Sequence, residues 1–347
     1  TGGDAPTPTT AAGDGATATT NTGVGAGVQP TMAPAAGEAQ PGGTLKLGYI
    51  SEPPTMDPRV SGATIAWRLF YNLFDPLVVQ DVETGDFLHG LATSWEISED
   101  GLIYTFGLKE GVTFHDGTDF NAEAVKFTFD SILEPELKSL TAIGYLGPYE
   151  KTEVIDDLTA EVHFTDPYAP FLNNLSHSVL SPVSPAAVAE HGADFGFNPV
   201  GTGPFIFQEW QQQTSMTFVR NPDYNWGSGV YLHEGPAYID ELVITFINES
   251  TTLMGTLENG ESDIIDAVAA QEVERLEGDD NFQILLPRVP GSPQVLPMNA
   301  VKHPTDDILV RKAIIQAVDM ETIVDTMWYG TRRAAAGPLS QPTWTYN

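Results

Sequence analysis

The first forty residues, Thr1 to Gln40, consist mostly of Thr, Ala, Gly, Pro and Asp and contain no aromatic side chain. Such a segment buries too little apolar surface to offset the conformational entropy that it loses on ordering. We therefore predict that residues 1–42 form a disordered tether and that the folded chain begins at Gly43. A Thr- and Pro-rich leader is typical of the stalk of an exported protein whose signal has been removed; an ordinary disordered tail is the alternative.

The charge of the chain excludes one class of partner. The 347 residues contain 15 Lys plus Arg and 47 Asp plus Glu, which gives a formal net charge of -32. A field of this sign repels phosphate backbones, so we expect no nucleic-acid partner. The chain has no cysteine, which rules out disulfides and thiolate metal sites. No apolar run approaches the roughly 20 residues of a membrane span.

The hydrophobic pattern from Gly43 onward predicts a mixed α/β fold, and the length suffices for about two domains. Alternating apolar residues predict strands at 44–50, 102–108, 159–166, 204–210 and 215–221, the last two as a hairpin. Helical spacing predicts helices at 63–76, 121–133, 251–260 and, in two pieces around Asp319, 306–330. The run 241–247 is apolar on both faces, which is typical of a central strand.

Local chemistry adds detail to these elements. We expect Ser61 or Thr64 to cap the helix over 63–76, and Asn121 to cap the helix that follows it. The Asp75–Pro76 pair should end the first of these helices, because a residue before proline avoids the α region. Its aromatic residues are expected to pack in the core: Trp67, Phe70, Tyr71 and Phe74.

The stretch NPVGTGPFIFQEW, residues 198–210, places two prolines and two glycines around Thr202 and leads directly into a strand. We expect Gly201 and Gly203 to provide positive φ angles and close backbone approach. Such a corner suits either a crossing between two parts of the protein or a wall against which a ligand lies.

Motifs for catalysis are absent from the sequence. There is no GxxxxGK[ST] phosphate loop and no GxSxG elbow, and the seven histidines show neither HExxH nor any i, i+4 pair. The Asp116–Gly117 pair reads as a turn before a helix rather than as a calcium loop. Nothing among the 47 acids selects a pair for glycoside hydrolysis. We therefore expect no enzyme, no cofactor and no metal.

Several segments in order carry a resemblance to a known family. They are GGTLKLGYISEPPTMDP, the block from LFDPLVVQ to KFTFDSIL, NPVGTGPFIFQEW with RNPDYNWG, and DILVRKAIIQAVDMETIVDTMWYG. Together they closely resemble the dipeptide/oligopeptide-binding proteins of ABC importers, the family 5 extracytoplasmic solute-binding proteins. The resemblance covers nearly everything from Gly43 to the C-terminus.

The resemblance implies a two-lobed clamp with an inserted subdomain in the first lobe. The first lobe is expected at 43–85 and 198–290, the insertion at 86–197, and an incomplete second lobe at 291–347. The corner at 201–204 then becomes the point where the chain re-enters the first lobe. A peptide captured between the lobes would be delivered to the permease of an ABC transporter.

Ligand-binding positions follow from the same resemblance. In the first lobe they fall on Ser61, Gly62, Ala63 and Thr64, with Thr202 and Gly203 as a further option. In the second lobe they fall on Gly291, Ser292, Pro293 and Gln294. For the loops 61–64 and 291–294, an ordinary Gly/Ser loop is the alternative.

The chain departs from the family by stopping at Asn347, before the point where relatives complete the second lobe. We expect a monomeric, extracytoplasmic protein held to the membrane by a lipid anchor upstream of residue 1. Nickel, haem, oligosaccharide and murein peptide remain alternative ligands within the same fold. A membrane-tethered sensory or adhesion protein is the alternative from another class.

Overall fold

The computed structural model describes residues 41–81, 84–231, 233, 235–285 and 292–340. The chain divides into two units, Thr1–Glu38 and Ala39–Asn347, and every described residue belongs to the second. The predicted tether therefore lies outside the described residues, apart from 41 and 42. In the described part of the chain, no helix has the length and apolar character needed to cross a bilayer.

Strands and helices alternate along the chain, as the hydrophobic pattern predicts. The strands are β1 (Thr44–Tyr49), β2 (Val78–Gln80), β3 (Phe87–His89), β4 (Ala92–Ile97), β5 (Ile103–Leu108), β6 (Tyr149–Asp156), β7 (Thr159–Phe164), β8 (Phe205–Gln211), β9 (Ser215–Arg220), β10 (Glu241–Phe246) and β11 (Ile264–Ile265).

The helices include α1 (Thr64–Leu73), α2 (Ala122–Ile132), α3 (Ala142–Leu146), α4 (Phe171–Leu175), α5 (Pro185–His191), α6 (Ser250–Glu258), α7 (Val273–Glu277), α8 (Ile308–Ala317) and α9 (Met320–Trp328). Short 3-10 turns lie at η1 (Pro135–Leu137), η2 (Ser178–Leu180), η3 (Gly192–Phe197) and η4 (Ala270–Glu272).

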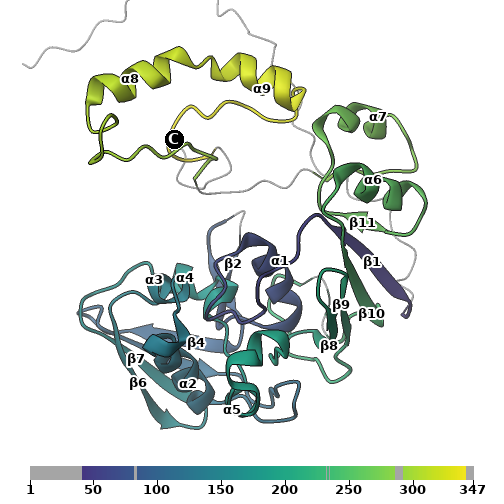
Figure 1. The fold of residues 1–347 in the computed structure, drawn as a ribbon. Helices are drawn as coiled ribbons and strands as arrows, with labels where there is room; N and C mark the ends of the chain where they lie inside the picture. Colours follow the sequence, from purple (N-terminus) through teal and green to yellow (C-terminus); the bar gives the residue numbers. More distant parts are fainter. Residues whose placement is uncertain (1–40, 82–83, 232, 234, 286–291, 341–347) are drawn as a thin grey trace, which may run out of the picture. The chain divides into compact units, whose positions relative to one another are not determined.

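A five-stranded sheet has the order β11-β1-β10-β9-β8. Strand β1 runs parallel to both neighbours, with Thr44 opposite Glu241 in β10 and Leu47 opposite Ile264 in β11. Strands β10, β9 and β8 continue the sheet in antiparallel pairs, which confirms the predicted hairpin. In Figure 1 the purple β1 lies beside the green β10, although the two are far apart in sequence. The predicted central position of strand 241–247 is confirmed.

A four-stranded antiparallel sheet has the order β4-β5-β7-β6, and β2 and β3 form a separate hairpin. The alternating apolar side chains of β5 and β7 are buried, as the predicted strands require: Tyr104, Phe106, Leu108, Ala160, Val162 and Phe164. Helix α2 packs against β6 and β7, as Figure 1 shows. The opposite face of the sheet carries polar residues.

Each sheet has its own hydrophobic core. The core of the five-stranded sheet contains Phe70 of α1 and Phe74 just after the helix, but also Phe195 from the segment that follows the other sheet. The core of the four-stranded sheet contains Phe129 of α2, together with Leu77 and the later residues Tyr224 and Trp226. Side chains from both parts of the chain thus enter both cores, because the chain crosses between the sheets near residues 75 and 200.

The predicted cap at Asn121 is confirmed. The Asn121 side chain accepts a hydrogen bond from the Ala124 amide at 3.1 Å, at the start of α2. The predicted break at Asp319 is confirmed too, because Asp319 separates α8 from α9; the structure adds that its side chain caps α9, accepting from the Thr322 amide at 3.0 Å.

The predicted cap of α1 is wrong. The N-cap residue is Ala63, and no side chain caps the helix there. Thr64 is already the first helical residue, and the Ser61 hydroxyl accepts instead from the Ala63 amide at 3.4 Å. The helix ends at Leu73, because Phe74 is extended before the Asp75–Pro76 pair is reached.

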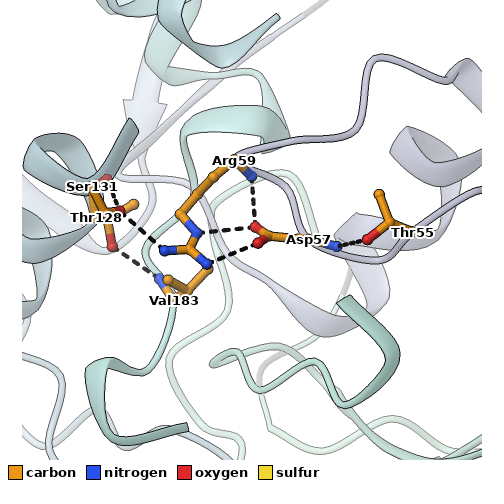
Figure 2. Close-up of polar contacts among 6 residues, drawn as sticks. All are labelled: Thr55, Asp57, Arg59, Thr128, Ser131 and Val183. Atoms are coloured by element: carbon orange, nitrogen blue, oxygen red, sulfur yellow. Dashed lines mark hydrogen bonds and ion pairs between the residues drawn. The ribbon is translucent and has the colours of Figure 1, made fainter. Parts of the chain in front are cut away.

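A buried ion pair fixes the loop between β1 and α1. The guanidinium of Arg59 donates to both carboxylate oxygens of Asp57, at 3.0 Å and 2.8 Å, and neither side chain is more than 7% exposed. Figure 2 shows Arg59 also donating to the Ser131 hydroxyl of α2, at 3.1 Å. The hydroxyl of Thr128, one turn earlier, accepts from the Val183 amide. This network ties the loop to the helix that covers the other sheet.

The corner at residues 201–203 presses its main chain against the end of α1. A Cβ atom on Gly201 would lie 2.0 Å from the Leu73 carbonyl oxygen, and one on Gly203 would lie 2.5 Å from the Leu73 carbonyl carbon. The Gly203 amide donates to the same Leu73 oxygen at 2.9 Å. Neither glycine has a positive φ, so this part of the prediction is wrong. Close backbone approach alone requires glycine here.

His115 holds the corner from the other side. Its amide donates to the Gly201 carbonyl at 2.9 Å, its Nδ1 accepts from the Gly201 amide at 3.4 Å, and its Nε2 lies 3.0 Å from the Gly203 carbonyl. This pattern fits a neutral ring with its proton on Nε2. Burial lowers the pKa of His115 to about 4. The Asp116–Gly117 pair forms the predicted turn, with Gly117 at a φ of 83°.

Asp75 is the buried carboxylate of the same junction. Its Oδ1 accepts from the Tyr224 hydroxyl at 2.9 Å, and its Oδ2 accepts from the Thr202 hydroxyl at 2.9 Å and the Trp226 Nε1 at 3.3 Å. Burial raises the pKa of Asp75 to about 6, against the opposing effect of these hydrogen bonds. The outgoing and returning segments of the chain are thereby joined through one carboxylate.

The close contact at the corner predicts a large effect of a single methyl group. Gly201→Ala forces a carbon onto the Leu73 carbonyl, so we expect it to lower the free energy of unfolding by about 2–4 kcal/mol. Gly255→Ala in α6 is the control, because nothing lies within 4 Å of its Cβ position. That substitution should stabilise the protein by about 0.5–1 kcal/mol. Urea unfolding measures the change in the free energy of unfolding for both variants. Equal changes in the two would contradict the close approach of Gly201 to Leu73.

The two buried titratable groups predict opposite pH dependences. The pKa of His115 is depressed when folded, so its contribution is present above pH 6.5 and is lost as the pH falls towards 4. The pKa of Asp75 is raised when folded, so its contribution is present below pH 3.8 and is lost as the pH rises through 6. Each contribution amounts to about 3 kcal/mol.

Urea unfolding at pH 4.5 and pH 7.5 checks these signs. His115→Gln should destabilise the protein more at pH 7.5 than at pH 4.5, and Asp75→Asn should destabilise it more at pH 4.5 than at pH 7.5. Each comparison is made with the unsubstituted chain at the same pH, which cancels the titration of the surface acids. A pH-independent effect of either substitution would contradict the corresponding burial.

Candidate functional site

The loop that the sequence selects, residues 61–64, is built on the buried Asp57. The amide of Ser61 donates to the Asp57 carbonyl at 3.0 Å, and the Trp67 Nε1 donates to the Ser61 carbonyl at 3.1 Å. Ser61 itself is only 2% exposed, whereas Gly62 and Thr64 are exposed and Ala63 is half-buried. The groups that a ligand can reach are therefore those of Gly62 and Thr64, with part of Ala63.

Gly62 lies against the start of α3. A Cβ atom at this position would lie 2.5 Å from the Thr141 hydroxyl oxygen, the residue directly before α3. The loop is thus in contact with a segment about eighty positions later in the chain. Close by in sequence, Leu140 is 86% exposed, which leaves a large apolar side chain in water beside the loop.

Trp67, which is hydrogen-bonded to this loop, belongs to a group of four aromatic residues that we call the aromatic surface: Trp67, Tyr71, Tyr145 and His177. The ring of His177 lies edge-on to Trp67, with centroids 4.6 Å apart, and tilted against Tyr145 at 4.8 Å. The Tyr71 hydroxyl donates to the Ser176 carbonyl at 3.4 Å. Tyr71 is 41% exposed, so the expectation that it packs in the core is wrong. Phe70 and Phe74 are buried as predicted, and Trp67 is half-buried and packs against both cores.

The aromatic surface is uncharged at neutral pH. Burial lowers the pKa of His177 and raises the pKa values of Tyr71 and Tyr145. A neutral aromatic surface favours stacking and contact with apolar groups.

One charged pair lies at the edge of this surface. Arg68, one residue after Trp67, pairs with Asp266 at 3.2 Å, and its side chain is 53% exposed. Asp266 follows β11 directly and also accepts from the Ile50 amide, just after β1, at 2.9 Å. The first turns of α1 therefore lie at the carboxyl ends of the parallel strands, the edge where open α/β sheets bind ligands.

The second pair of predicted residues lies at the other end of α1. Thr202 is 0% exposed and its hydroxyl donates to Asp75, while Gly203 contacts Leu73, the last residue of the helix. A ten-residue helix is about 15 Å long, so the structure does not bring Thr202 and Gly203 together with the loop 61–64. Thr202 serves the junction between the sheets, and its role as a ligand contact stays a prediction.

Three of the predicted residues of the second lobe are described, and Gly291 lies outside the described residues. Ser292 and Gln294 are exposed, Pro293 is half-buried, and the Ser292 hydroxyl donates to the adjacent Pro293 carbonyl at 3.4 Å. Among the described residues, no hydrogen bond joins these three to the loop 61–64 or to Thr202 and Gly203.

A shallow pocket of about 220 Å³ lies elsewhere, on the polar face of the four-stranded sheet. It contains none of the predicted ligand-binding residues and is lined by Glu96, Ile97, Ser98, Ile103, Thr105 and Glu161. The side chains spaced to hold a metal ion are on the same sheet: Glu153, Glu161 and His163.

The sequence contained a signal for part of the aromatic surface. Thr64, Trp67 and Tyr71 recur every three to four residues, so they share one face of α1, away from the buried stripe of Leu69 and Leu73. Tyr145 and His177 come from distant segments, and no local pattern indicates that they meet this face.

Comparison with known proteins agrees with this architecture. Residues 87–347 match the model of bacterial extracellular solute-binding proteins, family 5 middle. The glutathione-binding protein GsiB of Pectobacterium atrosepticum is 32% identical over 253 residues, which cover 72% of this chain and 47% of that protein. The chain spans about half the length of the curated relatives that it matches.

Two solved structures extend the likeness to the fold. DppA from Helicobacter pylori, in complex with the peptide STSA, matches with a TM-score of 0.76 and 28% identity, over 89% of this chain and 63% of that chain. AgaA of A. tumefacien R10, in complex with agropinic acid, matches with a TM-score of 0.73 and 29% identity, over 83% of this chain and 56% of that chain.

These matches confirm the predicted fold, a mixed α/β structure of the periplasmic-binding-protein type. The family model covers more than half of the residues, and it includes most of the segments that carry the resemblance seen in the sequence. This chain belongs to family 5 of the bacterial extracellular solute-binding proteins.

Proposed function

We propose that this chain is part of an extracytoplasmic protein that captures a peptide and delivers it to the permease of an ABC importer. The observation that carries the proposal is the aromatic surface beside Gly62 and Thr64, at the carboxyl end of the parallel strands. Among the similar proteins, GsiB is named for binding glutathione and DppA was solved with the peptide STSA, and both ligands are peptides. No catalytic role is proposed.

The geometry suits a ligand with varied side chains. The main chain of Gly62 is exposed, so an extended peptide can reach it from solvent, while Thr141 fills the place of the missing side chain. The rings of Trp67 and Tyr71 offer flat apolar contact that is indifferent to the identity of the ligand's side chain. Arg68 adds a positive charge next to this surface. Its side chain is half exposed even though it pairs with Asp266, so a ligand can reach it.

The division into lobes is part of the proposal. The five-stranded sheet takes its strands from residues 44–49, 205–220, 241–246 and 264–265, which supports a first lobe at 43–85 and 198–290. The four-stranded sheet takes all its strands from residues 92–164, which supports an insertion at 86–197. Residues 291–347 would begin the second lobe, whose contacts include 291–294.

The cellular location and the oligomeric state are also part of the proposal, and they rest on the similarity to family 5 proteins. We place it outside the cytoplasm as a monomer, with residues 1–42 as a tether to a lipid anchor at the membrane. The formal net charge of -32 favours solubility and separation of the molecules from one another.

A substitution at the loop tests the binding surface. Thr64→Lys places a long charged side chain over the aromatic surface, so we expect peptide affinity to fall by at least about ten-fold, or about 1.4 kcal/mol. Isothermal titration with a dipeptide, a tetrapeptide and glutathione measures the affinity, and nickel–histidine and haem complexes test the other ligand classes.

The matched control is Thr251→Lys. Thr251 is also an exposed threonine in the first turn of a helix, α6, so both substitutions place a cation at a helix N-terminus. Binding should be unchanged in this variant. Equal losses in both variants would place the ligand elsewhere, and an unsubstituted chain that takes up none of the peptides would contradict the proposed function.

A further inference from the structure

The polar face of the four-stranded sheet brings two glutamates and a histidine together. Glu153 of β6 lies directly opposite Glu161 of β7, and His163 is two residues further along β7, on the same face. Like charges directly opposite each other destabilise a sheet, so this pair needs a positive partner. Lys151, paired with Glu153, supplies one positive charge for two carboxylates.

The Nε2 atom of His163 points between the two carboxylates. It is buried from solvent and makes no hydrogen bond. The nearest carboxylate oxygens are Oε2 of Glu161 at 3.5 Å and Oε2 of Glu153 at 3.8 Å. A buried polar atom without a hydrogen bond is rare and calls for an explanation such as an ion.

The spacing of these three atoms fits a shared metal ion. Ligand atoms about 2.0–2.1 Å from a tetrahedral Zn²⁺ lie about 3.3–3.4 Å from one another. The separations of 3.5 and 3.8 Å exceed this value by only a few tenths of an ångström. All three ligand atoms lie within 4.8 Å of one another.

The other oxygen of each glutamate is held from outside the cluster. Oε1 of Glu153 accepts from Lys151, and Oε1 of Glu161 lies 3.5 Å from the Thr105 hydroxyl on β5. These contacts leave both Oε2 atoms directed towards His163, which is how outer partners orient metal ligands. Glu161 also lines the shallow pocket of about 220 Å³ next to the cluster, together with Thr105 of β5.

We propose that Glu153, Glu161 and His163 form a binding site for a divalent transition-metal ion, with Zn²⁺ as the best-suited member of this class. Imidazole nitrogen combined with carboxylate oxygen favours Zn²⁺ over Mg²⁺ and Ca²⁺, which prefer oxygen ligands alone. The bound ion would join β6 to β7 and neutralise the facing glutamates. This site lies apart from the aromatic surface and does not depend on the proposed transport function.

Zinc titration of the chelator-stripped chain tests the site. We expect one Zn²⁺ per chain by calorimetry and a rise of the thermal midpoint of at least about 2 °C in excess Zn²⁺. His163→Gln and Glu161→Gln should each weaken Zn²⁺ binding by at least about ten-fold. Both variants should show an unchanged circular dichroism spectrum in chelator, because their side chains lie on the solvent face of the sheet.

The controls separate this site from non-specific attraction to an acidic protein. His303→Gln removes an exposed histidine that lies 3.4 Å from one carboxylate, that of Asp306, and should leave Zn²⁺ binding unchanged. Mg²⁺ at the same concentration should produce no comparable rise in the midpoint. Zn²⁺ binding that survives His163→Gln, or that His303→Gln weakens equally, would overturn the proposal. An unsubstituted chain that binds no Zn²⁺ would overturn it as well.

Discussion

The contact between the glycine corner and the last turn of α1 is the constraint on which the arrangement of the two sheets depends. The chain leaves the five-stranded sheet through α1 and returns through residues 201–204, and at this point the two passages touch main chain to main chain. Thr202 and Asp75 join them by side chains, and His115 clamps the corner from the segment that precedes α2. A tightly packed crossing of this kind fixes where β8 begins, and with it the hairpin at the sheet edge.

The buried pair of Asp57 and Arg59 fixes the position of the candidate binding loop in a similar way. Removing two charges from water is unfavourable, and a buried pair persists only with good geometry and further hydrogen bonds. Here the guanidinium binds both carboxylate oxygens and the Ser131 hydroxyl, and it lies 5.2 Å from the ring centre of Phe195. The Asp57 carbonyl then receives the Ser61 amide. Orientation of the loop, rather than stability, is the role that this geometry supports.

Patterns that depend on neighbouring residues were predictable from the sequence. Period-two alternation located β5 and β7, and the cap at Asn121 follows from a side chain that reaches its own helix. The errors arose where tertiary contacts decide. The φ angle of Gly201 and the exposure of Tyr71 depend on what packs against them, which local spacing does not encode.

In the candidate sites too, local patterns were predictable from the sequence and tertiary contacts were not. The sequence pointed to the loop at 61–64, and the structure adds Tyr145 and His177 from segments about eighty and more than a hundred residues later. Thr202 looked accessible beside two glycines, yet its hydroxyl is needed to satisfy Asp75. Glu153 and His163 are ten positions apart, and only the register of β6 against β7 brings them together.

The parallel pairing of β1 has a consequence for the order of events during synthesis. Thr44 is bonded to Glu241, 197 positions later, and the other partner, β11, is made later still. At about 5–20 residues per second, the ribosome takes about 10–40 s to supply the first partner of β1. The four-stranded sheet, made from residues 92–164, is complete well before that time. Strand β1 therefore stays unpaired during synthesis, while the four-stranded sheet already has all of its strands and is able to fold.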